Sequence, residues 1–328
     1  VYPIFAQSSM AELGTDIHKA AAFLKQGNPV AIPTETVYGL AANALDEKAV
    51  RKIYEVKNRP LHNPLILHLS GKEELDKYVN DIPTVAHQLI EHFWPGPLTL
   101  LLQKKETVPE IITHGMPRVA VRVPNHPLTL ELLKNLSFPL AAPSANPSGY
   151  ISPTQAEHVQ QQIGTKIPYI LDGGNCTQGI ESTIVGFDNN EVIIYRLGAV
   201  SMEEIENITG DVSFYIRDEN TPQAPGMLLK HYSPRTPFYL TEDYLLTIKN
   251  MEEKKIGLLL FKQPKINLNI TQQEVLSVNG NLKEAASNLY AAMHRLDAAN
   301  LDVIIAEKFP DDGIGKAIND RLERAAVR

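Results

Sequence analysis

Residues 16–40 read DIHKAAAFLKQGNPVAIPTETVYGL and carry a helix signal followed by a strand signal. Asp16 precedes apolar residues spaced for one face of a helix, and Gly27 follows them as a stop signal. The apolar run Val30-Ala31-Ile32 then indicates a buried strand. Because a helix leading into a strand is a unit of α/β proteins, the stretch predicts that fold class.

Similar signals alternate along the rest of the chain, without an internal repeat or a low-complexity tract. Further helices are predicted near 46–56, 84–93 and 282–298 and from residue 314, and two capping boxes, Thr154/Glu157 and Ser201/Glu204, predict two more. Buried strands are predicted at 65–69, 98–102, 119–123, 140–142, 169–171, 182–187, 192–196, 255–261, 273–278 and 303–306.

The length of 328 residues favours two domains over one, because a single hydrophobic core rarely grows that large. Residues 211–237 contain several prolines and little periodicity, which is typical of a connecting segment. We therefore expect a first α/β domain over 1–210, a linker over 211–237 and a small second α/β domain over 238–328.

The composition excludes several classes of function. Lys and Arg number 31 against 38 Asp and Glu, a net charge of −7, which disfavours tight nucleic-acid binding. The single cysteine, Cys176, excludes an internal disulfide and a zinc site of several thiolates, and fits a reducing, cytoplasmic compartment. Apolar runs such as 98–102 and 256–261 are too short to cross a membrane.

Polar loops beside the predicted strands are the candidate binding segments. Loop 33–40 follows a strand, where open α/β sheets bind ligands, although its threonines also suit a structural turn. Lys57 and Arg59 stand two residues apart before Pro60, an arrangement that suits a phosphate clamp or a solvated helix end. Alternation along strand 65–69 places His68 opposite the leucines, where a structural role is also common.

Two further segments carry hydrogen-bonding side chains. Arg122 alternates with the valines of strand 119–123, so it is a candidate to bind a carboxylate, or else a member of a surface ion pair. Prolines restrict the loop around Ser144 and Asn146 to extended shapes and direct both side chains the same way. These residues suit sugar, base or phosphate oxygens, and equally a structural Asx turn.

Taken together, these segments resemble the threonylcarbamoyl-AMP synthase family, also called YrdC-like proteins. The resemblance rests on ordered motifs that span most of residues 1–210: Pro33 to Leu40, Lys57-x-Arg59-Pro60, Pro64-Leu65-Ile66, Pro95-Gly96-Pro97-Leu98-Thr99, Arg122-Val123-Pro124, Ser144-x-Asn146-x-Ser148-Gly149, Ser182-Thr183 and Arg196. Pro225-Gly226-Met227 and His231-Tyr232-Ser233-Pro234 resemble the linker of the longer, two-domain branch.

The resemblance implies a fold and a reaction. The fold is a twisted mixed-sheet YrdC-like domain followed by a small Rossmann-like accessory domain. The activity is that of a nucleotidyltransferase: L-threonine, bicarbonate or CO2, and ATP give L-threonylcarbamoyl-AMP and pyrophosphate. A separate transferase complex then uses the product to modify an adenosine of tRNA, so this chain itself need not bind tRNA.

The resemblance also implies roles for individual residues. Lys57 and Arg59 are expected to act in catalysis by neutralising charge, with no covalent nucleophile and no assigned general base. Mg²⁺ is expected to arrive with ATP and not on a protein site. The linker is expected to cover the site, with Lys230, His231 and Tyr232 reaching over the nucleotide. The expected ATP-binding residues are Lys57, Arg59, Ser144, Asn146, Arg196, His231 and Tyr232, and the expected L-threonine-binding residues are Thr36, His68, Arg122 and Ser182.

Two other classes of YrdC-like protein are alternatives to this family. A carbamoyltransferase with a YrdC-like domain needs cysteine-paired zinc fingers, which a chain with one cysteine cannot build. An RNA-binding YrdC-like module without catalysis is the second alternative, and the acidic net charge argues against it.

Overall fold

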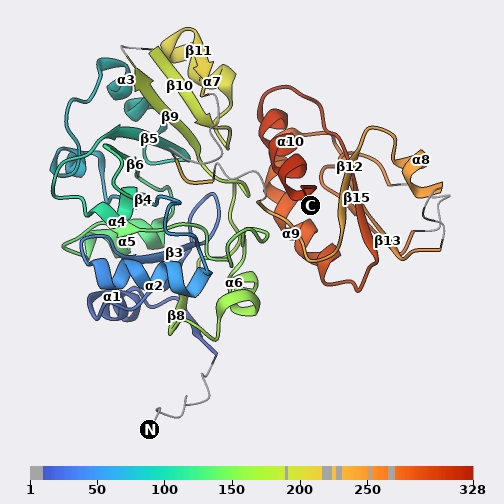
Figure 1. Cartoon of the computed structure of the whole chain (residues 1–328), viewed down its shortest axis with the longest axis horizontal. Helices are drawn as coiled ribbons and strands as arrows, with labels where there is room; N and C mark the ends of the chain where they lie inside the picture. The colour runs from blue at the N-terminus through green and yellow to red at the C-terminus, as the bar shows by residue number, and fades with distance from the viewer. Residues whose placement is uncertain are drawn as a thin grey trace.

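The computed structural model describes residues 10–188, 191–215, 224–226, 231–249, 251, 253–264 and 270–327. They form two α/β units side by side, a larger N-terminal unit and a smaller C-terminal one (Figure 1). The larger unit is built on a mixed sheet and the smaller on a parallel sheet. The predicted fold class is therefore confirmed.

The larger sheet has the strand order β1-β8-β2-β3-β7-β4-β6-β5-β9-β10-β11 among the described residues. Parallel and antiparallel pairs both occur, as in β4 beside β6 and β5 beside β6. Its strands are β1 Glu12–Gly14, β2 Val30–Ile32, β3 Gly39–Asn43, β4 Ile66–His68, β5 Leu98–Gln103, β6 Arg118–Arg122, β7 Leu140–Ala141, β8 Tyr169–Leu171, β9 Thr183–Asp188, β10 Glu191–Arg196 and β11 Val212–Phe214.

Helices pack on both faces of this sheet. Helices α2, α3, α6 and α7 bury their apolar residues in a core on one face, and α1 and α5 contribute to a core on the other. Asp16 caps α1 by accepting hydrogen bonds from the backbone of His18 and Lys19, as its position predicts. The helices are α1 Ile17–Lys25, α2 Glu47–Lys57, the 3₁₀ helix η1 Lys72–Lys77, α3 Thr84–Phe93, α4 Glu110–Thr113, α5 Pro127–Lys134, α6 Ala156–Ile163 and α7 Met202–Thr209.

Strand alternation decides which side chains are left for a site. Leu65, Leu67 and Leu69 enter the core beneath α2 and α3, so Ile66 and His68 project from the opposite face. His68 pairs in register with Arg122 on β6, whose valines enter the same core as the leucines. The sheet therefore presents a histidine and an arginine side by side on the face that α2 and α3 do not cover.

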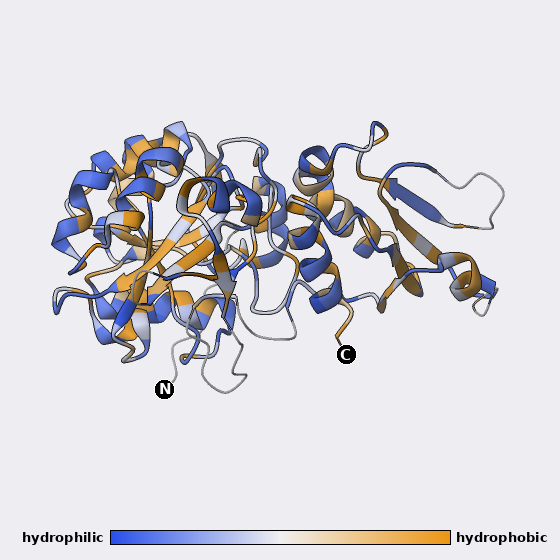
Figure 2. Ribbon diagram, turned by 90° about the horizontal axis from the view of Figure 1, so that it is seen from above, coloured by the Kyte–Doolittle hydropathy of each residue, from blue (hydrophilic) through white to orange (hydrophobic). Residues whose placement is uncertain are grey.

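The smaller unit is a parallel sheet of order β12-β15-β13-β14. Helices α9 and α10 pack on one face of it, while Ile248 of α8 joins the core on the other. Figure 2 shows the hydrophobic strands inside both units and the hydrophilic outer faces of the helices. The elements are β12 Phe238–Thr241, α8 Tyr244–Lys249, β13 Ile256–Leu260, β14 Gln272–Val275, α9 Leu282–Asp297, β15 Val303–Glu307 and α10 Ile314–Ala325.

Two local expectations need correction. The larger sheet continues past residue 210, where we expected the first domain to end, because β11 pairs in parallel with β10. The capping box Ser201/Glu204 is confirmed, but the box Thr154/Glu157 is wrong. Helix α6 begins after Gln155, so Thr154 lies outside the capping position.

Among the described residues, no helix has both the length and the apolar character to span a membrane.

Candidate active site

The polar loops of the larger unit converge with the linker on one cavity, which we call the linker cavity. It lies on the face of the sheet that carries His68 and Arg122. Nine of the eleven residues assigned to ATP or L-threonine line it: Thr36, Arg59, His68, Arg122, Ser144, Ser182, Arg196, His231 and Tyr232. Residues more than 190 positions apart in sequence therefore meet at one place.

Arg122 is anchored at one side of the linker cavity. Its Nη2 donates to Glu35 Oε2 at 2.9 Å and its Nη1 to Thr36 Oγ1 at 3.0 Å. Glu35 Oε2 also accepts from the backbone N–H of Asn125. The side chains of Arg122 and Glu35 are each only 4% exposed, so the ion pair is buried and not the surface pair considered from sequence. Loop 33–40 thus fixes the orientation of the guanidinium.

His68 lies beside Arg122 and is buried. Burial, with a further contribution from the charge of Arg122, lowers the pKa of His68 to about 3. The imidazole is therefore neutral at physiological pH, and it suits a hydrogen-bonding contact better than a proton donor.

Lys57 and Asn146 do not line the linker cavity, in contrast to their predicted places. Helix α2 ends at Asn58, whose left-handed backbone (φ 51°) leaves Lys57 as the last helical residue. Lys57 Nζ donates to the carbonyl oxygens of Ser144 and Asn146, at 2.5 Å each. The Asn146 amide donates to the carbonyls of Pro147 and Tyr150, and Asn146 does not line the cavity that Ser144 lines.

Lys57 nevertheless shapes the site, because it ties α2 to the loop that carries Ser144. Burial first, and then the charge of Arg59, lower the pKa of Lys57 well below its ordinary value. Arg59 itself faces the linker cavity and donates to the backbone carbonyls of Asn63 and Pro64. Burial, and to a lesser extent Arg196, lower the pKa of Arg59 to about 10, so it stays cationic at neutral pH.

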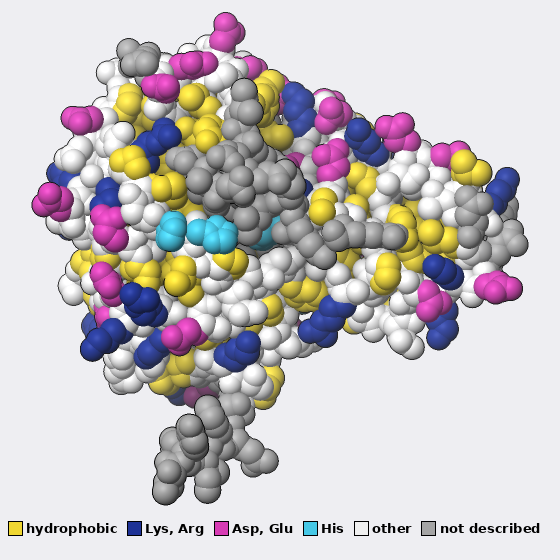
Figure 3. All heavy atoms as spheres, in the orientation of Figure 1, with side chains coloured by type: hydrophobic (Ala, Val, Ile, Leu, Met, Phe, Trp, Pro, Cys, Tyr) yellow, Lys and Arg dark blue, Asp and Glu magenta, His cyan; other side chains and the backbone are white. Residues whose placement is uncertain are grey.

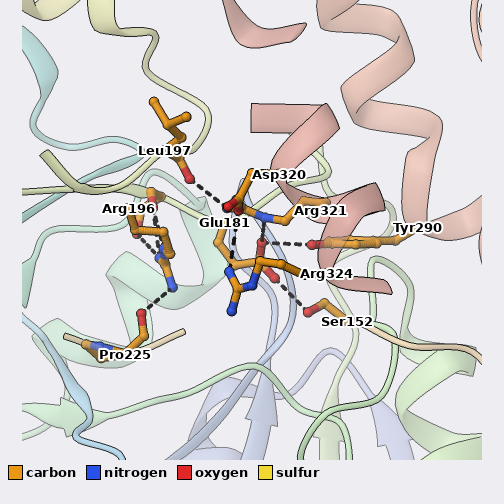
Figure 4. A network of polar contacts seen from close by, with 10 residues as sticks. Ser152, Glu181, Arg196, Leu197, Pro225, Tyr290, Asp320, Arg321 and Arg324 are labelled. Carbon is orange, nitrogen blue, oxygen red and sulfur yellow. Dashed lines mark hydrogen bonds and ion pairs between the residues drawn. The ribbon is translucent and has the colours of Figure 1, made fainter. Parts of the chain in front are cut away.

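Arg196 joins the sheet to the linker at the other side of the cavity (Figure 4). Its Nη2 donates to the carbonyl and the hydroxyl oxygens of Ser182, at 2.8 and 3.1 Å, and its Nη1 to the carbonyl of Pro225 at 3.1 Å. At Gly226 (φ 78°) a Cβ atom would lie 2.8 Å from Arg196 Nη1. Glycine therefore allows the linker backbone to approach the guanidinium closely.

The linker contributes His231 and Tyr232 to the lining of the cavity, while Lys230 lies outside the described residues. Burial, and next the charges of Arg324 and Arg59, lower the pKa of His231 well below its ordinary value. Three buried polar atoms of cavity-lining residues have no hydrogen-bond partner among the described residues: Arg122 Nε, His231 Nδ1 and Tyr232 Oη. Because buried polar groups are normally paired, these atoms indicate a place for a polar ligand.

Sequence reasoning missed Glu181, which also lines the linker cavity. The residue directly precedes the Ser182-Thr183 motif, but its partners Tyr290 and Arg321 belong to the C-terminal unit. No local signal reveals such a pairing.

Within the described ranges, no group of three or more His, Cys, Asp or Glu side chains is arranged to hold a metal ion.

The mixed sheet, the linker cavity on its face and the added C-terminal α/β unit define the class of two-domain YrdC-like proteins. Residues 22–198 match the Sua5–YciO–YrdC family model, described as telomere recombination. Residues 200–327 match a model described as threonylcarbamoyl-AMP synthase, C-terminal domain. The chain belongs to the threonylcarbamoyl-AMP synthase family, which confirms the resemblance seen in its motifs.

Individual relatives support the same assignment along nearly the whole chain. A threonylcarbamoyl-AMP synthase of Pyrococcus abyssi is 40% identical, and the match covers 94% of each chain. One of Bacillus subtilis is 38% identical, with 96% of this chain and 95% of the relative covered. The crystal structure of P. abyssi Sua5 complexed with L-threonine is similar with a TM-score of 0.89 at 38% identity, covering 97% of both chains.

Proposed function

We propose that the chain is an L-threonylcarbamoyladenylate synthase, a nucleotidyltransferase that makes L-threonylcarbamoyl-AMP and pyrophosphate from L-threonine, bicarbonate or CO2, and ATP. The observation that carries the proposal is the linker cavity, where Arg59, Arg122 and Arg196 meet unpaired buried polar atoms. The relatives named above supply the reaction: they are threonylcarbamoyl-AMP synthases, and one was solved with L-threonine.

The two sides of the cavity suit the two substrates. Arg122, with Thr36 and His68 beside it, offers a guanidinium for the L-threonine carboxylate and polar groups for its amine and hydroxyl. Ser182, which is assigned to L-threonine, accepts hydrogen bonds from Arg196, which is assigned to ATP. Arg59, Ser144, Arg196, His231 and Tyr232 form the side assigned to ATP.

The chemistry requires that two anions meet. The threonine amine captures CO2 as a carbamate, a carbamate oxygen attacks the α-phosphorus of ATP, and the bond to the β-phosphate oxygen breaks to release pyrophosphate. Arginines fixed before the substrates arrive lower the repulsion between carbamate and triphosphate. Such electrostatic stabilisation supplies a large part of the rate enhancement in phosphoryl transfer. Arg59 and Arg196 are fixed in this way by backbone carbonyls.

Lys57 contributes to catalysis in this proposal mainly by holding the loop that carries Ser144. Its amine is buried beside Arg59, and an approaching phosphate would favour the charged form. Mg²⁺ would enter on the triphosphate and screen its charge. A cavity lined by guanidinium groups fits such a metal–phosphate complex better than a bare cation.

The linker acts as a lid in this proposal. The linker cavity encloses about 50 Å³, whereas pockets for small ligands usually hold about 300–1,000 Å³. Substrates would therefore enter after Pro225, Gly226, His231 and Tyr232 move away. Closure would then exclude water, which destroys both the carbamate and the mixed anhydride.

The product would pass to a transferase complex that modifies tRNA. The RNA-binding alternative is not favoured, since the relatives are synthases and the chain is acidic. On the face seen in Figure 3, basic and acidic side chains are interspersed and form no continuous basic surface. The lone cysteine, buried Cys176, is consistent with a reducing, cytoplasmic location of the enzyme.

Omission of substrates tests the proposed reaction. We expect pyrophosphate release from ATP to require both L-threonine and bicarbonate, and the adenylate to appear by mass spectrometry in an amount equal to the pyrophosphate. L-serine at the same concentration is the matched control and should support slower release, because it lacks the threonine methyl group. Release that proceeds unchanged without L-threonine would contradict the proposed function.

A further inference from the structure

Arg321 of α10, a residue of the C-terminal unit, reaches into the larger unit (Figure 4). Its side chain is completely buried. Its Nε donates to Glu181 Oε2 at 3.0 Å and its Nη2 to the carbonyl of Leu197 at 2.8 Å. Its guanidinium carbon also lies 5.1 Å from the centre of the Tyr232 ring, within the range of a cation–π contact.

Each of these contacts involves a segment of the linker cavity. Glu181 lines the cavity and precedes Ser182, Leu197 follows Arg196, and Tyr232 belongs to the linker. Asp320, the neighbour of Arg321 on α10, accepts from Nη1 at 2.6 Å and so helps to fix the guanidinium. One side chain from the last helix therefore holds three separate segments around the candidate site.

Glu181 is the centre of the network. Its carboxylate accepts from Ser152 Oγ at 2.7 Å and from Tyr290 Oη at 2.9 Å, in addition to Arg321. Burial opposes ionisation of Glu181, but the charges of Arg321 and, next, Arg196 outweigh burial and lower its pKa. Arg196 is therefore the second cation that acts on this carboxylate.

We propose that Arg321 is a positioning residue of the active site: by pairing with Glu181 and Tyr232 it leaves Arg196 free to bind Ser182, the linker and the nucleotide. The inference rests on the proposed function. Without Arg321, the Glu181 carboxylate would be buried with one cation missing, a costly arrangement. The Glu181 carboxylate would then attract the Arg196 guanidinium and weaken its hydrogen bonds to Ser182 and Pro225. The C-terminal unit thus supplies a residue that positions the site.

The network differs from two ion pairs that also join the two units. Lys316, also on α10, pairs with Glu203 of α7 at 2.6 Å, and Lys283 of α9 pairs with Glu204 at 3.4 Å. None of these four residues lines the linker cavity. Lys316→Ala is therefore a matched control that removes an ion pair between the units from the same helix.

A double-mutant cycle tests the proposal on the full chain. We expect Arg321→Met to raise the KM for ATP and L-threonine about tenfold or more in the pyrophosphate-release assay. Adding Glu181→Gln removes the uncompensated carboxylate, so the double variant should recover most of the loss. Lys316→Ala should stay within about twofold of the wild type, since a partly exposed pair contributes little.

Three results would overturn the proposal. They are an Arg321→Met variant with unchanged KM values, a double variant that is no better than Arg321→Met, and a Lys316→Ala variant that is equally impaired. If Arg321→Met does not fold, Tyr290→Phe removes one donor to Glu181 while keeping the ring, and it should raise both KM values by about threefold; no change in KM would then contradict the proposal.

Hydrogen exchange separates this inference from the proposed function. Arg321→Met should speed amide exchange in residues 181–184 and 231–233 relative to Lys316→Ala, with no substrate present. A wild-type chain that releases no pyrophosphate would refute the synthase activity, while the exchange comparison would still test the positioning. Equal exchange in the two variants would refute the positioning alone.

Discussion

Arg196→Met is expected to reduce pyrophosphate release by about 100-fold or more, the usual cost of losing one preorganised donor that stabilises developing charge. Arg196 combines two tasks. Its guanidinium supplies positive charge to the linker cavity, and it connects Ser182 on the sheet with Pro225 on the linker. Methionine has a comparable length but neither the charge nor the donors, so it would lose both the attraction for phosphate and the closed linker.

Arg118→Met is the control for this variant. Arg118 begins β6 and lies 5.4 Å from the centre of the Tyr195 ring, outside the linker cavity. It should keep nearly full activity. Both variants should show native circular dichroism, and titration calorimetry should find weaker ATP binding only in Arg196→Met. Normal turnover of a folded Arg196→Met variant would remove this arginine from the account.

Arg122→Met is expected to raise the KM for L-threonine about 100-fold while leaving ATP binding within about threefold. In the proposed function, the substitution removes a charge-assisted contact to the substrate carboxylate, and such contacts are among the strongest in proteins. The same change leaves Glu35 buried without its cation, which should lower the free energy of unfolding by about 3–5 kcal/mol. Kinetics and thermal denaturation together measure the two effects.

Glu35→Gln separates stability from substrate binding in this case. In the variant Arg122→Met/Glu35→Gln no charge is stranded, so much of the stability should return. The KM for L-threonine should stay high, because the guanidinium is still missing. Recovery of L-threonine binding in the double variant would show that Arg122 acts only through the fold.

Local patterns were sufficient for the elements that build the core. The spacing of Ile17, Ala20, Ala21 and Leu24 predicted α1, and continuous apolar runs predicted strands such as β5 and β13. Alternation placed His68 and Arg122 on the open face of the sheet. These predictions succeed because an element with one buried face has apolar residues at the regular spacing of a helix or a strand.

Other elements form because they pair with strands distant in sequence, and their own residues give no signal of this pairing. Strand β1 is short and mostly exposed, and it forms because β8 pairs with it. Strand β3 consists largely of small residues and is held between β2 and β7. Neither has the β-branched composition that marks a strand, so neither was predicted.

The same distinction explains the candidate site. Its loops could be predicted because their residue types carry chemistry, but the directions of Lys57 and Asn146 depend on the left-handed turn at Asn58 and on the loop packed against it. Arg321 carried no local signal, since its importance arises only when α10 packs on the larger unit.

A crystal structure of the chain with L-threonine and a non-hydrolysable ATP analogue tests the central claim most directly. We predict the triphosphate beside Arg59 and Arg196, the L-threonine carboxylate on Arg122, and the linker displaced or reclosed around both ligands. Ligand density at a place that none of these three arginines reaches, with the linker cavity unchanged, would contradict the account.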